Sequence, residues 1–244
     1  MDEDAPVDPT DSETIQWRRD ASTSRTVRLL WSLGVGTFFA AITIIVFWRL
    51  YDMATQADAG GVVIAAFAAI AVTLFALAVS GNTERQLEAV TRRLPIDTPS
   101  GRALERAMDA VLGTLAMIAV MGGLMVAGRI VSQRELLAVG AGPFTGLAAL
   151  LIPLALVALA LSSFLRSIGA FDRDERTIYL YDPDQAIDLE DIRDVSARQL
   201  GDATILKLEY AQPDGQYVAG PRRIVVPPEV ASELQSLVER QPAQ

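Results

Sequence analysis

Six acidic side chains lie close together in the sequence between residues 182 and 194, and carboxylates in such a group could bind a metal ion. The group comprises Asp182, Asp184, Asp188, Glu190, Asp191 and Asp194. Carboxylate oxygens suit calcium or magnesium, but this spacing does not match a helix–loop–helix calcium loop. Runs of acids are also common on solvated surfaces. We therefore expect no metal site and no cofactor.

Most catalytic mechanisms are excluded by residue types that the chain lacks. The 244 residues include no Cys and no His, which removes thiol nucleophiles, imidazole bases and the usual zinc ligands. Phosphate-binding glycine loops are absent too, because "GVG" at 34–36 lies in an apolar block with no strand before it. We expect a protein that is not an enzyme.

Arg222 and Arg223 are the one adjacent basic pair near the end of the chain, and they are a possible partner surface. From Arg166 onward the chain holds fifteen acidic and nine basic residues, a net charge of −6. Anionic lipid headgroups and nucleic acids require clustered cations. The charge balance therefore disfavours both, and we expect no nucleic acid as a partner.

Four apolar blocks dominate the first two thirds of the chain. They cover 29–47, 60–80, 110–128 and 136–164, and none contains a charged residue. A helix needs about 20 mostly apolar residues to cross a bilayer. The sequence predicts an α-helical integral membrane protein with a four-helix domain over 28–165, whose spans cover about 29–50, 60–80, 109–130 and 137–164.

Arginine placement predicts the orientation of these spans. Three arginines flank the block ends on one side, at 49, 129 and 134. Twelve flank the ends on the other side, at 18, 19, 25, 28, 85, 92, 93, 102, 106, 166, 173 and 176. Because basic residues stay in the cytoplasm, we expect a multi-pass protein of the cell membrane with both termini and the loop 81–108 cytoplasmic.

Small residues and prolines predict how the spans pack. Small side chains allow close approach of helices in lipid, and they recur at four-residue spacing in three blocks: Gly36 and Ala40; Ala119, Gly123 and Ala127; Gly142 and Gly146. These faces suit a four-helix bundle or a homo-oligomer. Pro143 and Pro153 are candidate kinks, although the span containing Pro143 can also begin just after it.

Of the polar segments outside the spans, one is predicted to be disordered and one to be helical. Residues 1–27 are acidic and are expected to form a disordered tail, not a signal peptide. The loop 81–108 is expected to form a short helical hairpin at the membrane surface. Asn82 or Thr83 caps its first helix, Pro95 ends that helix, and Ser100 caps the second.

Residues 166–241 are expected to form a small cytoplasmic α+β domain. Alternating stretches predict strands at 176–181 and 203–210, "RRIVV" at 222–226 is a third strand candidate, and a fourth is expected inside 186–199. After Pro227 and Pro228 a helix begins, and Val230, Leu234, Leu237 and Val238 form its apolar stripe. The domain is therefore an antiparallel sheet with a C-terminal helix.

The stretches "IDLEDIRDV" and "VVPPEVASELQSLV" resemble the later part of bacterial pleckstrin-homology-like domains. The resemblance covers about residues 170–240 and implies that the first strands of the fold are missing or replaced by "SIGAFDRDE". Another small sheet-plus-helix module remains the alternative. Four spans followed by such a domain, in an acidic chain with one lysine, resemble membrane proteins of halophilic archaea; an acidic protein from a GC-rich genome is the alternative.

Two functions remain open on the sequence. The first is a non-enzymatic membrane protein in which four helices in the lipid bilayer anchor a cytoplasmic module for binding a protein partner or for oligomerisation. The alternative is a small oligomeric transporter or channel, in which Pro143 and Pro153 would be the working residues. A coupled transporter normally needs an ionisable side chain inside the membrane, and the four apolar blocks contain none.

Overall fold

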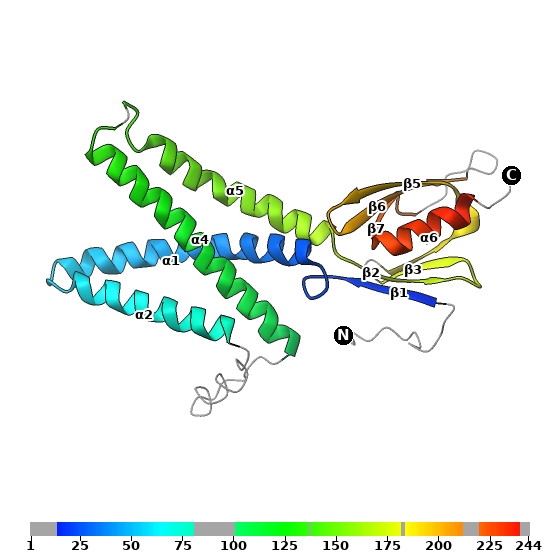
Figure 1. The fold of residues 1–244 in the computed structure, drawn as a ribbon, viewed down its shortest axis with the longest axis horizontal. Coiled ribbons are helices and arrows are strands. Elements are labelled where there is room, and N and C mark those ends of the chain that lie inside the picture. Colours follow the sequence, from blue (N-terminus) through cyan, green and yellow to red (C-terminus); the bar gives the residue numbers. More distant parts are fainter. Residues whose placement is uncertain (1–13, 81–100, 137, 182–183, 212–219, 240–244) are drawn as a thin grey trace. The chain divides into compact units, whose positions relative to one another are not determined.

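The chain folds into two units, which are described separately. A computed structural model describes residues 14–80, 101–136, 138–181, 184–211 and 220–239 (Figure 1). The sheet unit combines the residues up to Val27 with those from Ser163 onward, and the helical unit covers Arg28–Ser162. The helical unit is therefore an insertion between two parts of one sheet unit.

The helical unit is built from four long apolar helices: α1 (Arg25–Thr55), α2 (Gly60–Val79), α4 (Gly101–Gln133) and α5 (Gly142–Phe164). All four are long and apolar enough to cross a membrane. Helices α1 and α4 extend well beyond the apolar blocks, because the flanking polar residues continue the helix. The expected hairpin helix over 83–94 and its caps lie outside the described residues.

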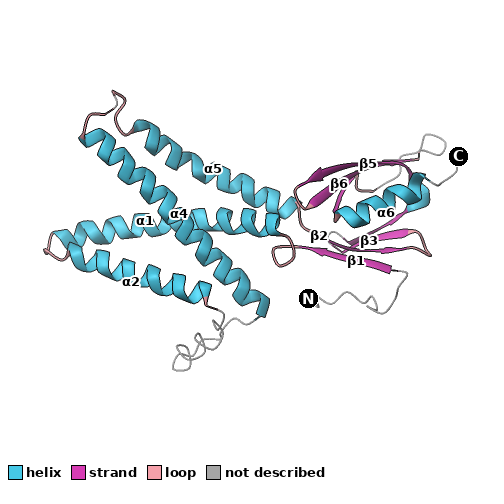
Figure 2. Cartoon of the chain, viewed as in Figure 1, coloured by secondary structure: helices cyan, strands magenta, loops and turns pink. Residues whose placement is uncertain are grey.

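The sheet unit contains two antiparallel sheets and one helix (Figure 2). The first sheet has the order β1 (Thr14–Arg19), β2 (Ser167–Asp172), β3 (Thr177–Tyr181) and β4 (Asp184–Asp188). The second has the order β5 (Ile192–Leu200), β6 (Ala203–Tyr210) and β7 (Arg223–Val226). Helix α6 (Pro228–Glu239) follows, which confirms the expected sheet with a C-terminal helix.

The expected disordered tail over 1–27 is wrong for its second half. Residues 14–19 form β1, which pairs with β2 from Thr14 opposite Asp172 to Arg19 opposite Ser167. The physical reason is side-chain fit: Trp17 lies opposite Gly169, and a Cβ at Gly169 would come within 2.5 Å of the Trp17 ring. The buried Trp17 Nε1 also donates to Ser167 Oγ at 3.0 Å. Residues 1–13 lie outside the described residues.

The region after β3 differs from the single strand that was expected within 186–199. It forms two strands, β4 and β5, which belong to different sheets and are joined by a short 3-10 turn at Leu189–Asp191. Asp188 caps this turn by accepting from the Glu190 backbone N–H at 2.8 Å. Leu189 is almost fully buried, so the corner between the sheets is also anchored in the core.

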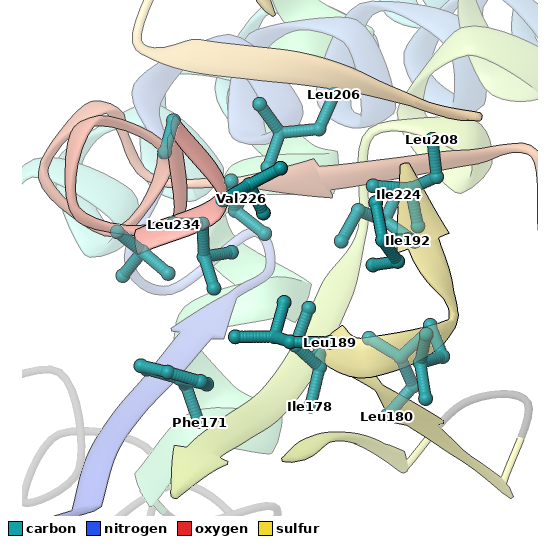
Figure 3. Close-up of a cluster of buried hydrophobic side chains, with 14 of the residues drawn as sticks. Phe171, Ile178, Leu180, Leu189, Ile192, Leu206, Leu208, Ile224, Val226 and Leu234 are labelled. Carbon is teal, nitrogen blue, oxygen red and sulfur yellow. The ribbon is translucent and has the colours of Figure 1, made fainter. Parts of the chain in front are cut away.

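One apolar core lies between the two sheets and α6 (Figure 3). It is built from alternate residues of the strands, such as Ile178 and Leu180 on β3 and Leu206 and Leu208 on β6. Helix α6 contributes Val230, Leu234 and Val238, with Leu237 partly buried. Trp17 belongs to the same core, so residues far apart in sequence complete a single packed interior.

Candidate functional site

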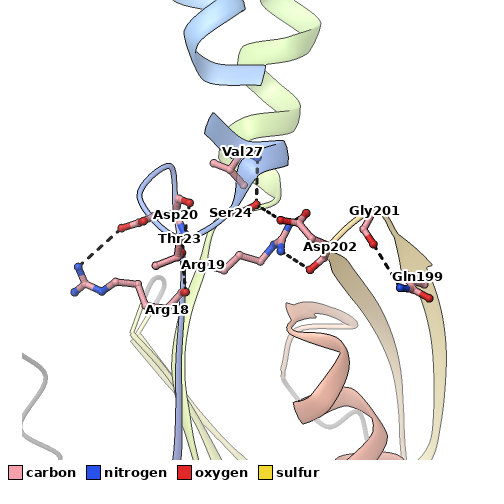
Figure 4. A network of polar contacts seen from close by, with 9 residues as sticks. All are labelled: Arg18, Arg19, Asp20, Thr23, Ser24, Val27, Gln199, Gly201 and Asp202. Atoms are coloured by element: carbon pink, nitrogen blue, oxygen red, sulfur yellow. Dashed lines mark hydrogen bonds and ion pairs between the residues drawn. The ribbon is translucent and has the colours of Figure 1, made fainter. Parts of the chain in front are cut away.

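The most densely bonded polar cluster in the sheet unit lies where β1 ends, at the turn between β5 and β6 (Figure 4). Arg19 is buried and donates from one terminal nitrogen to the Asp202 carboxylate at 2.7 Å and from the other to the Asp202 carbonyl at 2.6 Å. The turn is the two-residue connection Gly201–Asp202, in which Gly201 has φ +63°. A glycine first in such a turn supplies the positive φ that the geometry requires.

The same carboxylate also holds the first turn of α1. The Ser24 hydroxyl donates to Asp202 Oδ2 at 2.8 Å and accepts from the Val27 backbone N–H at 3.2 Å. Ser24 is thus the N-cap of α1, and a hydroxyl hydrogen bond from Thr26 reaches Asp202 as well. One side chain therefore connects the end of β1 and the start of α1 to the β5–β6 turn.

These contacts change the acidity of Asp202. Burial alone would raise the pKa of the carboxyl group, but hydrogen bonds from Arg19, Thr26 and Ser24, together with the Arg19 charge, outweigh burial and lower the pKa well below its ordinary value. Asp202 is therefore charged at every physiological pH. The Arg19 Nε is buried without a hydrogen-bond partner in the described residues, a donor that water would satisfy.

The cluster has the chemistry of a structural joint. Its members are a guanidinium, a carboxylate and hydroxyls, and the hydroxyl of Ser24 is already committed to bonds on both sides. Among the described residues, no three acidic side chains come close enough together to hold a metal ion. Asp188, for example, caps a turn.

The two arginines of the predicted partner surface, Arg222 and Arg223, do not form one common surface in the structure. Arg222 stacks over the Tyr210 ring at 4.6 Å, and the Tyr210 hydroxyl donates to the Pro221 carbonyl at 3.1 Å. Arg223 is exposed on β7 and lies opposite Lys207 of β6. The two arginines therefore have different surroundings, and only Arg223 stands on an open sheet face.

Of the predicted packing residues, Gly36 and Ala40 lie in a helix contact. A Cβ at Gly36 would come within 2.3 Å of the Gly113 backbone on α4, and one at Gly113 would come within 2.1 Å of the Ser32 carbonyl. Ala40 is fully buried with Met117 and Met121. Helix α1 also meets α5, because a Cβ at Gly34 would contact Leu159.

The α4 stripe of Ala119, Gly123 and Ala127 does not form this contact. Gly123 has no atom within 4 Å of an added Cβ, and Ala119 is exposed. The contact uses Gly113, Met117 and Met121 instead, a stripe two residues out of step and so about 200° around the helix. The sequence did not single out Gly113, because the third apolar block contains several stripes of small residues and the sequence alone does not show which of them packs against α1.

The glycines of α5 make no close contact in the structure, and its two prolines lie at different depths in the helix. Added Cβ atoms at Gly142 and Gly146 would also meet open space, so an assembly between copies stays a prediction for these two. Pro143 lies in the first turn of α5, where no backbone hydrogen bond is lost, so the expected kink there is wrong. Pro153 lies inside α5, and the helix continues through it.

An ion pair between α1 and α4 was also missed. Arg28 Nε donates to Asp109 Oδ2 at 2.7 Å, and a second bond joins Arg28 Nη2 to Oδ1. Asp109 is buried. It immediately precedes the third apolar block, so a search within the blocks did not reach it. The pair fixes the register of α1 against α4 four residues before the Ser32–Gly113 contact.

Comparison with known proteins supplies no relative: no protein-family model, no curated protein and no solved structure matches this chain. The class that the fold defines is a chain of four long apolar helices joined to an antiparallel sheet unit with a final helix. Its function must therefore be inferred from the architecture and from these contacts.

Proposed function

We propose that the chain is a non-enzymatic integral membrane protein whose helical unit anchors a cytoplasmic module for binding a protein partner or assembling copies of the chain. The observation that carries the proposal is the pairing of β1 with β2 around Trp17 and Gly169. It makes the sheet unit a complete folded module in which both connections to the helices leave from neighbouring strands.

The exposure of apolar side chains supports the placement of the helices in lipid. Every exposed large apolar side chain identified in the described residues, except Leu200, lies between Leu29 and Phe164. Contiguous apolar surface on this scale is unusual for a protein in water. A bilayer removes that cost, since lipid tails are as apolar as the side chains that they contact.

Strand pairing supports an even number of crossings. Arg19 lies opposite Ser167 in one sheet, so the chain must return to its starting side between these residues. Four spans meet this requirement. The excess of arginines at these ends, twelve against three, then favours the cytoplasm for both termini.

The sheet unit also supports the resemblance to pleckstrin-homology-like domains. Residues 166–241 alone lacked strands for that fold, and β1 supplies one from before the helices. We propose that the module is such a domain, split by insertion of the helical unit, and that its role is recognition. Its net negative charge favours a protein partner over an anionic headgroup.

The groove in the helical unit offers little to the alternative of a transporter. A groove of about 800 Å³ lies among α1, α2 and α4, and its lining is apolar apart from Thr43 and Thr114. The Thr114 hydroxyl donates to the Ala110 carbonyl at 2.7 Å. A polar solute would find few partners on such a surface.

The test compares full-length protein with a Gly169→Val variant, which should disrupt the module and leave the helices intact. Both are crosslinked in native membranes and purified, and bound proteins are identified. We expect a specific partner, or a second copy, with the wild type and its loss with Gly169→Val. Equal recovery from both proteins, or no assembly with either, would refute the proposal. A matched Gly123→Ala variant controls for substitution within the protein.

A further inference from the structure

The outward face of the three-stranded sheet carries charges in an unusual order. Successive residues of a strand point to opposite faces, so Lys207 and Glu209 point outward where Leu206 and Leu208 enter the core. The strand register places Glu209 opposite Asp194 of β5 and Lys207 opposite Arg223 of β7. All four charged side chains are exposed.

This arrangement lowers the stability of the isolated chain, because like charges that lie directly opposite one another on neighbouring strands repel. The two inner charges compensate each other: Lys207 Nζ donates to Glu209 Oε1 at 2.6 Å. Asp194 and Arg223 make no ion pair with any described residue. One acid and one base are thus left uncompensated on the same face.

The two uncompensated charges cannot meet within one chain. Asp194 is on β5 and Arg223 on β7, with β6 between them, and strands are spaced about 4.8 Å apart. The two residues occupy opposite corners of the patch formed by Asp194, Glu209, Lys207 and Arg223. If the patch is rotated by 180° about its centre, which is the midpoint between Lys207 and Glu209, the position of Asp194 falls on that of Arg223.

We propose that this patch binds the same patch on a second copy of the chain, with Asp194 of each copy paired with Arg223 of the other. A two-fold interface requires a self-complementary surface, and a two-fold axis in the plane of the patch, at right angles to the line from Asp194 to Arg223, places Asp194 of each copy over Arg223 of the other. Complementary charges mainly supply orientation and discrimination between partners. The inference rests on the proposed function and names the partner of the module.

Cysteine crosslinking tests the geometry, and the chain has no native cysteine to interfere. Full-length Asp194→Cys and Arg223→Cys proteins are co-expressed and treated in native membranes with a thiol-reactive crosslinker that spans about 10 Å, the separation of two facing sheets. In the dimer this reach joins position 194 of one copy to position 223 of the other, whereas equivalent positions of the two copies lie farther apart. We expect the mixture to form dimers and each variant alone to form few. A mixture that crosslinks no better than either single variant overturns the proposal.

Charge exchange provides the second measurement, on full-length protein in detergent. Asp194→Arg and Arg223→Asp should each weaken the dimer about tenfold or more, since each places like charges together. The double variant should recover the wild-type affinity. Asp184→Arg, an equal charge change on exposed β4, should leave the affinity unchanged.

The outcomes separate this inference from the proposed function. Failure of the double variant to recover the dimer would refute the pairing of Asp194 with Arg223. A monomer that still retains a different protein in a Gly169-dependent way would refute the dimer and leave the recognition module standing. If neither a dimer nor a retained protein is found, both proposals fall.

Discussion

The sheet unit and the helical unit place their apolar side chains in opposite ways. The sheet unit packs Phe171, Ile178, Leu206 and their neighbours into one closed core. In the helical unit the cluster around Ala40 contains two other buried residues, Met117 and Met121, and α2 exposes most of its apolar length. The sheet unit hides its apolar side chains from water, whereas the four helices are long and apolar enough to cross a membrane and leave apolar surface exposed.

The difference shows what stabilises each unit. The sheet unit depends on burying large side chains, so it needs every strand of its core, including β1 from the far end of the chain. In the proposed bilayer, the helical unit gains little from apolar burial, so its specificity would rest on close backbone contacts and on ion pairs. Gly36 against Gly113, and Arg28 with Asp109, are contacts of this kind.

The largest expected effect comes from separating the units. Residues 167–244 alone lack β1 and Trp17, and we expect them not to fold cooperatively in detergent-free buffer. Joining residue 19 to residue 167 through an Asn-Gly turn should give a folded soluble module, because Arg19 and Ser167 are already paired and such turns suit two-residue hairpins. Circular dichroism and urea unfolding of both proteins measure this. Equal unfolding curves would contradict a role for β1.

The next effect concerns the Trp17–Gly169 pair. Trp17→Ala in the fused module should lower the free energy of unfolding by about 3–5 kcal/mol, the usual cost of truncating a buried aromatic side chain. Gly169→Val should be comparably harmful, since its Cβ would also come within 2.6 Å of the Tyr179 carbonyl. Urea denaturation measures both. Gln16→Ala, at an exposed position of the same strand, is the matched control and should be nearly neutral.

Asp202 should matter less, because its side chain is partly exposed. Asp202→Ala removes the carboxylate beside the buried Arg19 and should cost about 2–3 kcal/mol, below the range for a fully buried pair. The pKa of Asp202 is lowered in the folded state. Its contribution is therefore present above the unfolded pKa of about 4 and is lost as the pH falls below that value. Urea midpoints between pH 7 and pH 3 measure this dependence.

A wild-type module whose midpoint changes with pH no more than that of Asp202→Ala would contradict this role. The comparison removes the shared effect of all other carboxylates. In the full-length protein, Ser24→Ala removes the N-cap of α1 and should cost about 1 kcal/mol, measured by thermal unfolding in detergent.

The smallest expected effect is on the stability of the helical unit, and it tests which face of α4 packs against α1. Gly113→Ala should destabilise the purified protein by about 1–3 kcal/mol, since the added methyl group overpacks the α1 contact. Gly123→Ala adds the same methyl group to the same helix in open space and should be neutral or slightly stabilising. Thermal unfolding in one detergent compares them. A loss for both variants, or for neither, would contradict the assigned contact face.

Local patterns in the sequence predict local structure well in both units. Uncharged blocks of about twenty residues predict the four helices, alternation predicts β3 and β6, and spacings of three and four residues predict the stripe of α6. These features depend on periodicities of a few residues. The strand expected within 186–199 is present as β5, but the sequence did not predict the separate strand β4 before it. The corner at Leu189 that separates the two strands depends on a second sheet, which no local pattern describes.

By itself, the sequence determines that four segments are too apolar for water, that thiol and imidazole chemistry is absent, and that a sheet and a helix end the chain. The tertiary structure alone decides that residues 14–19 belong to that sheet, that Gly113 and not Gly123 meets α1, and that Asp202 holds the start of α1. The physical reason is distance along the chain. Trp17 fits the space over Gly169 across about 150 residues, and complementarity of shape at that range leaves no periodic trace in either segment.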